Sequence, residues 1–389
     1  MAESLIRRNQ DESLPQKNRM KIGLVRRGYS PTGGAERFLI RFAEGLRAQG
    51  HQAVLFSDCG WPSSAWDDSR YGMVSLASAG RTLSPLDFAD ALEAVQPKQH
   101  CDFLFSFERV WNCDAYRAGD GVHRAWLQRR VLFEPGYKSW FRGRQKKHRQ
   151  MLELEVALYC PQSGVRIVAN SQMVKKEIIE IFGKPEDHIT VIANGYDAES
   201  SSAEQRLELR RKKRQQWGVA EDEMVLFFAG SGWERKGLVF ALQAFAQFKQ
   251  SSQAHFIVAG KGKAPRGVSG QGVHFLGEVD GLTPSYEAAD VFILPTLYDP
   301  FSNACLEAAA HGLPVITTTA NGFADVVQHS QQGAIVEPGD VDGMAMALGK
   351  FAADFPDPKR HEIRDWAAQY SVARNVQASL EFIESCGRG

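Results

Sequence analysis

Short apolar segments that alternate with helical patterns constrain the fold of this chain more than any other feature. The first segment, residues 21–25, is followed by a loop and by apolar residues at helical spacing, and Gly50 ends that helical pattern. Further segments of this kind are 53–57, 101–107, 165–170 and 189–195. Continuous apolar strands that alternate with helices are typical of a parallel, doubly wound α/β sheet.

The same alternation restarts after a polar stretch at residues 198–216. Within that stretch, the basic run 206–214 is interpreted as a solvated helix face. The second series of apolar segments comprises 223–230, 255–260, 273–277, 290–295, 314–318 and 333–338. A chain of 389 residues is long enough for two cores, so the pattern predicts two Rossmann-like domains that meet near residues 197–215.

Composition narrows the class of protein. Lys plus Arg and Asp plus Glu both number 46, and this neutral balance argues against a general nucleic-acid binder. Six cysteines lack CxxC pairs, which favours reduced thiols over a zinc site or disulfides. No apolar run approaches the roughly 18 residues that span a bilayer. The polar residues 1–19 are expected to form a disordered leader, and the expected location is the cytoplasm, with attachment to a membrane face left open.

The glycine pair Gly33-Gly34 in TGGAER (32–37) follows the first predicted strand. Glycines let backbone N–H groups approach a ligand closely, and the start of the following helix favours anions. A tight turn without a ligand is the alternative. A dinucleotide fingerprint is not supported, because the pattern GxGxxG is absent here.

Two adjacent cations, Arg235 and Lys236, occupy the matching place in the second half. They follow a glycine-bearing turn, and an arginine beside a lysine is suited to holding a diphosphate. The segment is no P-loop, because GK[ST] is missing. Ordinary surface cations are the alternative interpretation.

Two carboxylates, Asp299 and Glu307, flank a predicted helix start in DPFSNACLE. If the helix starts at Ser302, Glu307 lies roughly 7 Å along its axis and Asp299 lies outside it. The two acids are therefore not a close glycosidase-type pair. They would flank an extended ligand, with its anionic part on the helix start at Ser302 and Asn303 and with ribose and sugar at its ends. A capping acid plus an exposed helix acid is the alternative.

Together these motifs resemble the family 4 glycosyltransferases of the GT-B fold, over roughly residues 20–388. The E-x7-E motif of that family corresponds to Asp299-x7-Glu307, its basic pair to Arg235-Lys236, its NGxD turn to residues 194–197 and its glycine loop to TGGAER. The chain departs from the family pattern by having Asp where Glu is usual at 299 and Ser302-Asn303 where Gly-Leu is usual. These departures leave the donor sugar open.

The resemblance implies roles for the site residues. Arg235 and Lys236 would stabilise the leaving nucleoside diphosphate, and Glu307 would hold the ribose. Asp299 would orient the transferred hexose, with Gly34 near the phosphate from the opposite domain. The family retains the anomeric configuration and needs no metal or cofactor. The one DxD sequence here, residues 340–342, lies in a late loop before a helix.

The resemblance also implies a domain division. A terminal helix that crosses back to the first domain is usual in this fold. The N-terminal, acceptor-binding domain is therefore predicted at 20–197 plus 372–389, and the nucleotide-sugar-binding domain at 198–371. Asp120 and His123, in AGDGVHRAW, are expected at the acceptor site, where His123 would bond a sugar hydroxyl. A loop Asp that caps the next helix is the alternative.

Residues 124–149 contain nine Lys or Arg and one acid, interleaved with aromatic residues. Such a composition suits an anionic membrane surface, although nucleic acid or a solvated basic helix would also fit it. In the setting of a glycosyltransferase the membrane interpretation is preferred, because a lipid-linked saccharide acceptor lies at the inner leaflet. The expected location then becomes peripheral, at the inner face of the cytoplasmic membrane, and no nucleic-acid partner is expected.

The segment around 105–130 resembles the glucosyltransferases that add the first glucose to a heptose of lipopolysaccharide inner core. This likeness implies transfer of glucose from UDP-glucose with the alpha configuration. A family 4 transferase with another donor or acceptor, such as an N-acetylhexosamine or a capsule or O-antigen precursor, remains open. A non-catalytic sugar-nucleotide-binding protein and a sugar-nucleotide epimerase are further alternatives.

Overall fold

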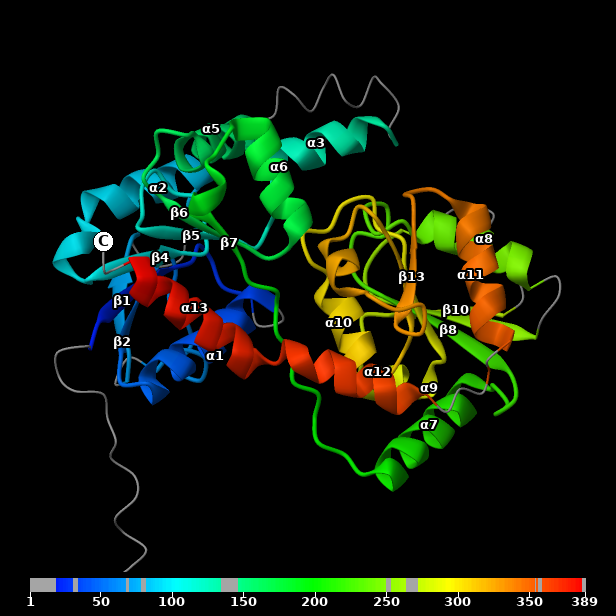
Figure 1. Ribbon diagram of the computed structural model, residues 1–389. Coiled ribbons are helices and arrows are strands. Elements are labelled where there is room, and N and C mark those ends of the chain that lie inside the picture. Colours follow the sequence, from blue (N-terminus) through cyan, green and yellow to red (C-terminus); the bar gives the residue numbers. More distant parts are fainter. Residues whose placement is uncertain are drawn as a thin grey trace, which may run out of the picture.

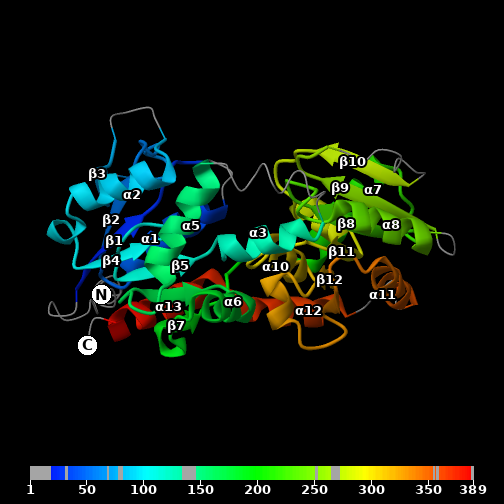
Figure 2. The same ribbon diagram turned by 90° about the horizontal axis from the view of Figure 1, so that it is seen from above.

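Two parallel sheets, each covered by helices, make up the chain and stand side by side in both views (Figure 1, Figure 2). The computed structural model describes residues 19–30, 34–67, 70–77, 82–133, 146–249, 253–263, 272–353, 355 and 359–386. The predicted leader therefore lies outside the described residues except for Arg19. The predicted fold class, two Rossmann-like α/β domains, is confirmed.

The first sheet has seven parallel strands in the order β3-β2-β1-β4-β5-β6-β7. Its central strands are apolar and buried on both faces, as their continuous hydrophobic sequences predict. The strands are β1 (Lys21–Val25), β2 (Gln52–Ser57), β3 (Gly72–Ser75), β4 (Phe103–Ser106), β5 (Ala115–Ala118), β6 (Arg166–Ala169) and β7 (Ile189–Val191).

Strands β3 and β5 were missed by the sequence pattern. Strand β3 lies at the sheet edge and is half-exposed, so it has no continuous apolar run. Strand β5 is only four residues long and contains Arg117, which interrupts its hydrophobic pattern. Parallel pairing with β4 and β6 holds β5 in place. The loop with Asp120 therefore follows β5 directly.

The second sheet has six parallel strands in the order β10-β9-β8-β11-β12-β13. Each corresponds to an apolar segment of the second series. The strands are β8 (Met224–Ala229), β9 (Ala254–Ala259), β10 (Val273–Gly277), β11 (Val291–Leu294), β12 (Val315–Thr318) and β13 (Gly333–Val336).

Helices cover both faces of the sheets, and several begin at a serine cap. Ser171, Ser202 and Ser302 each accept a hydrogen bond from a backbone N–H in the first turn of the helix that follows. The helices are α1 (Gly34–Ala48), α2 (Pro85–Ala94), α3 (His123–Val131), α5 (Lys146–Tyr159), α6 (Gln172–Phe182), α7 (Ala203–Trp217), α8 (Leu238–Phe248), α9 (Thr283–Ala288), α10 (Asn303–Ala310), α11 (Val341–Ala353), α12 (Arg360–Ala367) and α13 (Val372–Cys386).

The chain crosses back from the second domain to the first at its end (Figure 1). Helix α12 packs on α10, and α13 packs on α1. Val376 of α13 lies so close to Gly45 of α1 that a Cβ at Gly45 would be 2.3 Å from it. Val376, Leu380 and Ile383 therefore share a core with the first sheet.

Helix α7 carries the basic run 206–214, and its interpretation as a solvated face holds for Arg211 and Lys212, which are exposed, but not for Arg214. Arg214 is 1% exposed and donates hydrogen bonds to Ala288 O and to the carboxylate of Asp290. Its neighbour Arg210 forms an ion pair with the same carboxylate at 2.9 Å. The run thus anchors α7 to the second domain. Among the helices of the described ranges, none is long and apolar enough to cross a membrane.

Candidate active site

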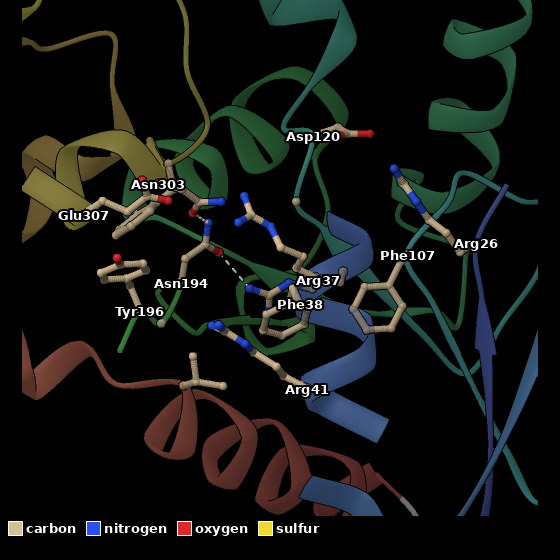
Figure 3. Close-up of a pocket in the computed structure, with 15 residues that line it drawn as sticks. Arg26, Arg37, Phe38, Arg41, Phe107, Asp120, Asn194, Tyr196, Asn303 and Glu307 are labelled. Carbon is tan, nitrogen blue, oxygen red and sulfur yellow. Dashed lines mark hydrogen bonds between the residues drawn. The ribbon is translucent and has the colours of Figure 1, made fainter. Parts of the chain in front are cut away.

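A cavity of about 210 Å³ opens between the two domains, at the carboxyl ends of the sheets (Figure 3). Helix α1 forms one wall, and α10 forms the facing wall. The lining residues are Arg26, Arg37, Phe38, Arg41, Phe107, Arg117, Gly119, Asp120, Asn194, Gly195, Tyr196, Phe301, Asn303, Glu307 and Val372. Ligands of open α/β folds bind at such an edge, so this cavity is the first candidate site.

Glu307 lies on the α10 wall, in the fifth position of the helix. The hydroxyl of Tyr286 donates to its Oε2 at 3.2 Å. Burial raises the pKa of Glu307, against the opposing effects of this hydrogen bond and of Arg37 and Arg41 across the cavity. Glu307 is thus a partly desolvated acceptor, suited to hydroxyl groups such as those of a ribose.

Lys236 and Asp299 form an ion pair at the edge of the second sheet, with side-chain exposures of 13% and 9%. The lysine comes from the loop before α8, and the aspartate comes from the loop between β11 and α10. The two loops lie close together because Gly237, at φ +72°, has no side chain; a Cβ there would be 1.9 Å from Pro295 O. Two residues predicted from separate motifs are therefore in contact.

Arg235 supports the same loop. Its Nη1 donates to Tyr298 O at 2.8 Å, and its own carbonyl accepts from Leu297 N at 2.8 Å. These bonds fix the backbone that immediately precedes Asp299. In this structure Arg235 donates its hydrogen bond to the protein backbone, and Lys236 is the cation that pairs with Asp299.

Ser302 and Asn303 have different surroundings at the start of α10. The Oγ of Ser302 accepts from Cys305 N at 3.4 Å and so serves as the helix cap. Asn303 instead lines the cavity, where its Oδ1 accepts from Asn194 Nδ2 at 2.7 Å. The two residues were predicted as one ligand-binding pair, but only Asn303 faces the cavity.

The turn at residues 194–197 joins the two domains. Asn194 also accepts from Arg117 Nη2 at 2.8 Å, so it bridges the first sheet and α10. A Cβ at Gly195 would be 2.5 Å from Ser371 O, which explains the glycine. Asp197 accepts from Val372 N at 3.2 Å, at the first residue of α13. This motif therefore holds the crossing point of the chain beside the cavity.

Tyr298, which sequence reasoning missed, links the donor-side loop to the first domain. It is 3% exposed and packs in the core of that domain, with its ring stacked on Trp126. Its hydroxyl donates to Glu177 Oε2 at 2.9 Å and accepts from Val122 N at 2.8 Å. Gly121, at φ +68°, lies so close that a Cβ there would be 2.5 Å from this hydroxyl. Asp299 is thereby positioned against the loop that carries Asp120.

Glu155 of α5 holds that loop from the other side. Its carboxylate accepts from the backbone N–H groups of His123 and Arg124 at the start of α3. It also forms an ion pair with Arg109 at 3.0 Å, and Arg109 donates to Gly121 O at 2.7 Å. Both charged side chains are almost fully buried, so the loop rests on a desolvated ion pair.

Asp120 lines the cavity, whereas His123 is not among the residues that line it. His123 Nε2 lies 2.9 Å from His148 Nδ1. Burial, reinforced by Arg109 and His148, lowers the pKa of His123 to about 4. The imidazole is therefore neutral at pH 7 and has one ring nitrogen in use.

The predicted residues thus divide into three groups. Asp120, Asn303 and Glu307 line the cavity. Arg235, Lys236, Asp299 and Ser302 lie in the loops beside it, and His123 is not part of its lining. Gly34 is the first residue of α1, and Gly33 lies outside the described residues. Their assigned roles stay predictions.

Four cavity arginines were not predicted: Arg26, Arg37, Arg41 and Arg117. Arg37 and Arg41 are four residues apart on α1, so they share one helix face, and Figure 3 shows both on the wall opposite Glu307. That spacing, directly after a glycine loop, was a signal available in the sequence. Arg117 gave no such signal, because it lies on a strand that was itself missed.

Comparison with known proteins identifies the family. "Glycosyltransferase Family 4" matches residues 32–200, and "Glycosyl transferases group 1" matches residues 223–354. An uncharacterized glycosyltransferase of Methanocaldococcus jannaschii is 29% identical over 49% of this chain, and the match spans 51% of that protein.

Two relatives match over most of both chains. The lipopolysaccharide core biosynthesis glycosyltransferase LpsE of Rhizobium meliloti is 25% identical over 84% of this chain and 87% of its own. The lipopolysaccharide glucosyltransferase WaaG of Escherichia coli is 23% identical over 84% and 88%.

Solved structures show the same fold. The crystal structure of WaaG aligns with a TM-score of 0.73 at 21% identity, over 93% of this chain and 99% of that one. Anabaena Alr3699/HepE in complex with UDP-glucose aligns with a TM-score of 0.69 at 20% identity, over 94% and 100%. The two matching family descriptions, the paired parallel sheets and the cavity between them lead to one conclusion: the chain belongs to the family 4 glycosyltransferases and is a hexosyltransferase of the GT-B fold.

Proposed function

We propose that this hexosyltransferase takes glucose from UDP-glucose and transfers it, with retention and without a metal ion, to a heptose of lipopolysaccharide inner core. The observation that carries the proposal is the Lys236–Asp299 pair beside the cavity that contains Glu307. A nucleotide sugar laid across the start of α10 would place its ribose at Glu307, its diphosphate near Lys236 and its hexose near Asp299.

In this arrangement Lys236 is the main residue that stabilises the negative charge of the leaving diphosphate. The bond between the anomeric carbon and the diphosphate oxygen breaks while the acceptor hydroxyl oxygen bonds to that carbon, and the hydroxyl proton passes to the released diphosphate. Lys236 faces the charge that develops on the diphosphate, in a site largely closed to water. Asp299 holds the ammonium in position. His123, neutral and bonded to His148, is not among the residues that line the cavity and is given no role as a base; its hydrogen bond to a sugar hydroxyl stays a prediction.

The donor and acceptor assignments draw on the named relatives. Alr3699/HepE binds UDP-glucose on the same fold, and both LpsE and WaaG carry lipopolysaccharide in their names. The aspartate at 299 and the Ser302-Asn303 pair leave another hexose or N-acetylhexosamine, and a capsule or O-antigen acceptor, as outcomes of the test.

The first test is a panel of nucleotide sugars, incubated with purified protein and EDTA but without acceptor. We expect selective binding of UDP-glucose and its slow hydrolysis, followed by mass spectrometry, with rates that EDTA leaves unchanged. Preference for another nucleotide sugar would discard the glucose assignment. Binding without hydrolysis or transfer would favour a non-catalytic protein, and conversion of the sugar to an epimer would favour an epimerase.

We further propose that the protein acts at the inner face of the cytoplasmic membrane, through part of residues 124–149. At one end of this segment, Val131 and Leu132 at the end of α3 are 52% and 77% exposed. At the other end, Lys146, Lys147 and Arg149 are exposed at the start of α5. Exposed apolar side chains and exposed cations at the two ends of one segment suit an anionic lipid surface. Residues 134–145, between these two ends, lie outside the described residues.

Arg129 is better assigned to the protein interior than to this surface. Its Nη2 forms an ion pair with Glu177 Oε1 at 2.8 Å, and its guanidinium lies over the ring of Tyr298. It therefore supports the contact between the domains. A membrane test that includes Arg129 would disturb that contact as well, so the variant should leave it unchanged.

Replacing Lys146, Lys147 and Arg149 together with glutamine is expected to weaken binding to vesicles of anionic lipid roughly tenfold or more. Each cation near such a surface contributes about 1 kcal/mol. Vesicle sedimentation measures the binding, and UDP binding should stay unchanged. The control is the double variant Arg211→Gln/Lys212→Gln, which removes two exposed cations from α7 in the other domain. If the triple variant sediments with vesicles as the wild type does, this surface does not dock on the membrane.

A further inference from the structure

We propose that the floor of the cavity is an oxyanion subsite, formed by Arg37, Arg41 and Arg117, that binds a phosphate group other than the diphosphate of the donor. The inference rests on the proposed function in one respect, because it takes Lys236 as the cation of the donor diphosphate. It adds a second anionic ligand group that the transfer reaction by itself does not require.

Arg117 is the strongest reason for the proposal. It is only 4% exposed, and it lines the cavity from β5. Its guanidinium stacks on the ring of Phe38 at 4.3 Å, and its Nη2 donates to Asn194 Oδ1. Its Nη1 is buried and has no hydrogen-bond partner. A buried hydrogen-bond donor without a partner is rare in proteins unless a ligand or a water molecule accepts its hydrogen bond.

The charge of Arg117 is also uncompensated. Within the described ranges no carboxylate forms an ion pair with it, and burial lowers the pKa of Arg117 to about 10. Removing a cation from water without a counter-charge is unfavourable. An incoming anion would offset that cost, and the planar guanidinium presents paired donors that match phosphate oxygens.

Arg37 and Arg41 supply two further cations from α1. Both are exposed and point into the cavity in Figure 3. In the part of the chain that the structure describes, neither has a hydrogen bond or an ion pair. A phosphate monoester carries a charge of about −1.5 to −2 at pH 7, so more than one arginine is needed to balance it. Three arginines around one cavity meet this need.

The other charged lining residues do not remove this surplus. Arg26 is already balanced, since it pairs with Glu36 at 3.0 Å and with Glu108 at 2.7 Å. Glu307 lies on the facing wall, across the cavity from Arg37 and Arg41. Asp120 is drawn at the opposite end of the cavity from Arg41 in Figure 3. The positive floor is therefore formed by the three named arginines.

The subsite is separate from the donor clamp but linked to it. Neither Lys236 nor Asp299 lines this cavity. Arg117 nevertheless bonds Asn194, and Asn194 bonds Asn303 at the start of α10. An anion held by Arg117 would thus be linked through Asn194 and Asn303 to the start of α10, the helix on which the donor is proposed to bind. The phosphate group bound at this subsite would belong either to the acceptor saccharide or to free inorganic phosphate.

The test is calorimetric titration of the full chain with inorganic phosphate, with and without saturating UDP. We expect phosphate to bind in both cases. The exposed pair Arg37→Gln/Arg41→Gln and, separately, Arg117→Gln are expected to weaken phosphate binding at least tenfold while UDP affinity changes less than twofold. Arg47→Gln, at the far end of α1, is the control and should change neither. Lys236→Ala should show the reverse pattern, with UDP weakened and phosphate retained.

Absence of phosphate binding, competition between phosphate and UDP, or unchanged phosphate affinity in the arginine variants would overturn the proposal. Transfer assays then separate the sources: inhibition by phosphate that is competitive with acceptor indicates an acceptor phosphate, and a change in turnover without competition indicates a free effector. If the wild type does not turn over UDP-glucose, the proposed function is contradicted. The phosphate titration still tests the subsite in that case, because it does not depend on turnover.

Discussion

Replacing Lys236 with alanine is expected to lower kcat for hexose transfer by about 10²–10³-fold. The variant removes the cation that faces the developing charge of the diphosphate, in a site where side chains are mostly shielded from water. Because this charge is largest in the transition state, the loss should appear in kcat more than in KM for the donor. Initial rates at saturating UDP-glucose measure the effect.

Two further variants separate chemistry from structure. Lys236→Ala leaves Asp299 buried without its partner, whereas Lys236→Ala/Asp299→Asn removes both charges. Recovery of activity in the double variant would show that the rate loss of Lys236→Ala comes from a disturbed loop. Lys350→Ala, on the exposed face of α11, is the matched control for loss of a lysine. Unchanged kinetics in Lys236→Ala would contradict the role assigned to this residue.

Replacing Glu155 with glutamine is expected to lower the free energy of unfolding of the first domain by about 3–5 kcal/mol. The side chains of Arg109 and Glu155 are 4% and 0% exposed, so the variant leaves the arginine charge buried without a counter-charge. It also weakens the acceptor for two backbone N–H groups at the start of α3. Urea unfolding followed by circular dichroism measures the change.

The double variant Arg109→Met/Glu155→Leu tests the cause. A buried ion pair replaced by apolar side chains of similar size is often close to neutral in stability, so this variant should regain most of the loss. Glu153→Gln, on the exposed face of the same helix, should change the unfolding free energy by less than about 0.5 kcal/mol. Equal stability of Glu155→Gln and wild type would show that the pair does not hold the loop.

Local features of the fold followed from the sequence. The apolar segments became strands of both sheets, Ser302 became the cap of α10, and Glu307 lies near the predicted place in that helix. Each of these depends on a few consecutive residues, either on burial of a continuous apolar run or on one hydroxyl that bonds a nearby N–H. Strand β5 was not predicted, because its four residues include Arg117 and because pairing with β4 and β6 holds them in place.

Contacts at the site were decided by the tertiary structure. Tyr298 bonds Glu177 across 121 residues, and Arg109 pairs with Glu155 across 46. The sequence around each residue gives no sign of its partner, because each pair forms only when a loop and a helix far away in the sequence are brought together.

The sequence by itself thus determined the two parallel sheets and the acids and cations at their carboxyl edges, since these follow from local patterns. The tertiary structure alone decided that Lys236 pairs with Asp299, that Tyr298 joins the domains and that Arg37, Arg41 and Arg117 line one cavity with Glu307. The physical reason is that charge pairing and burial depend on distances in space, which the packing of one domain against the other sets.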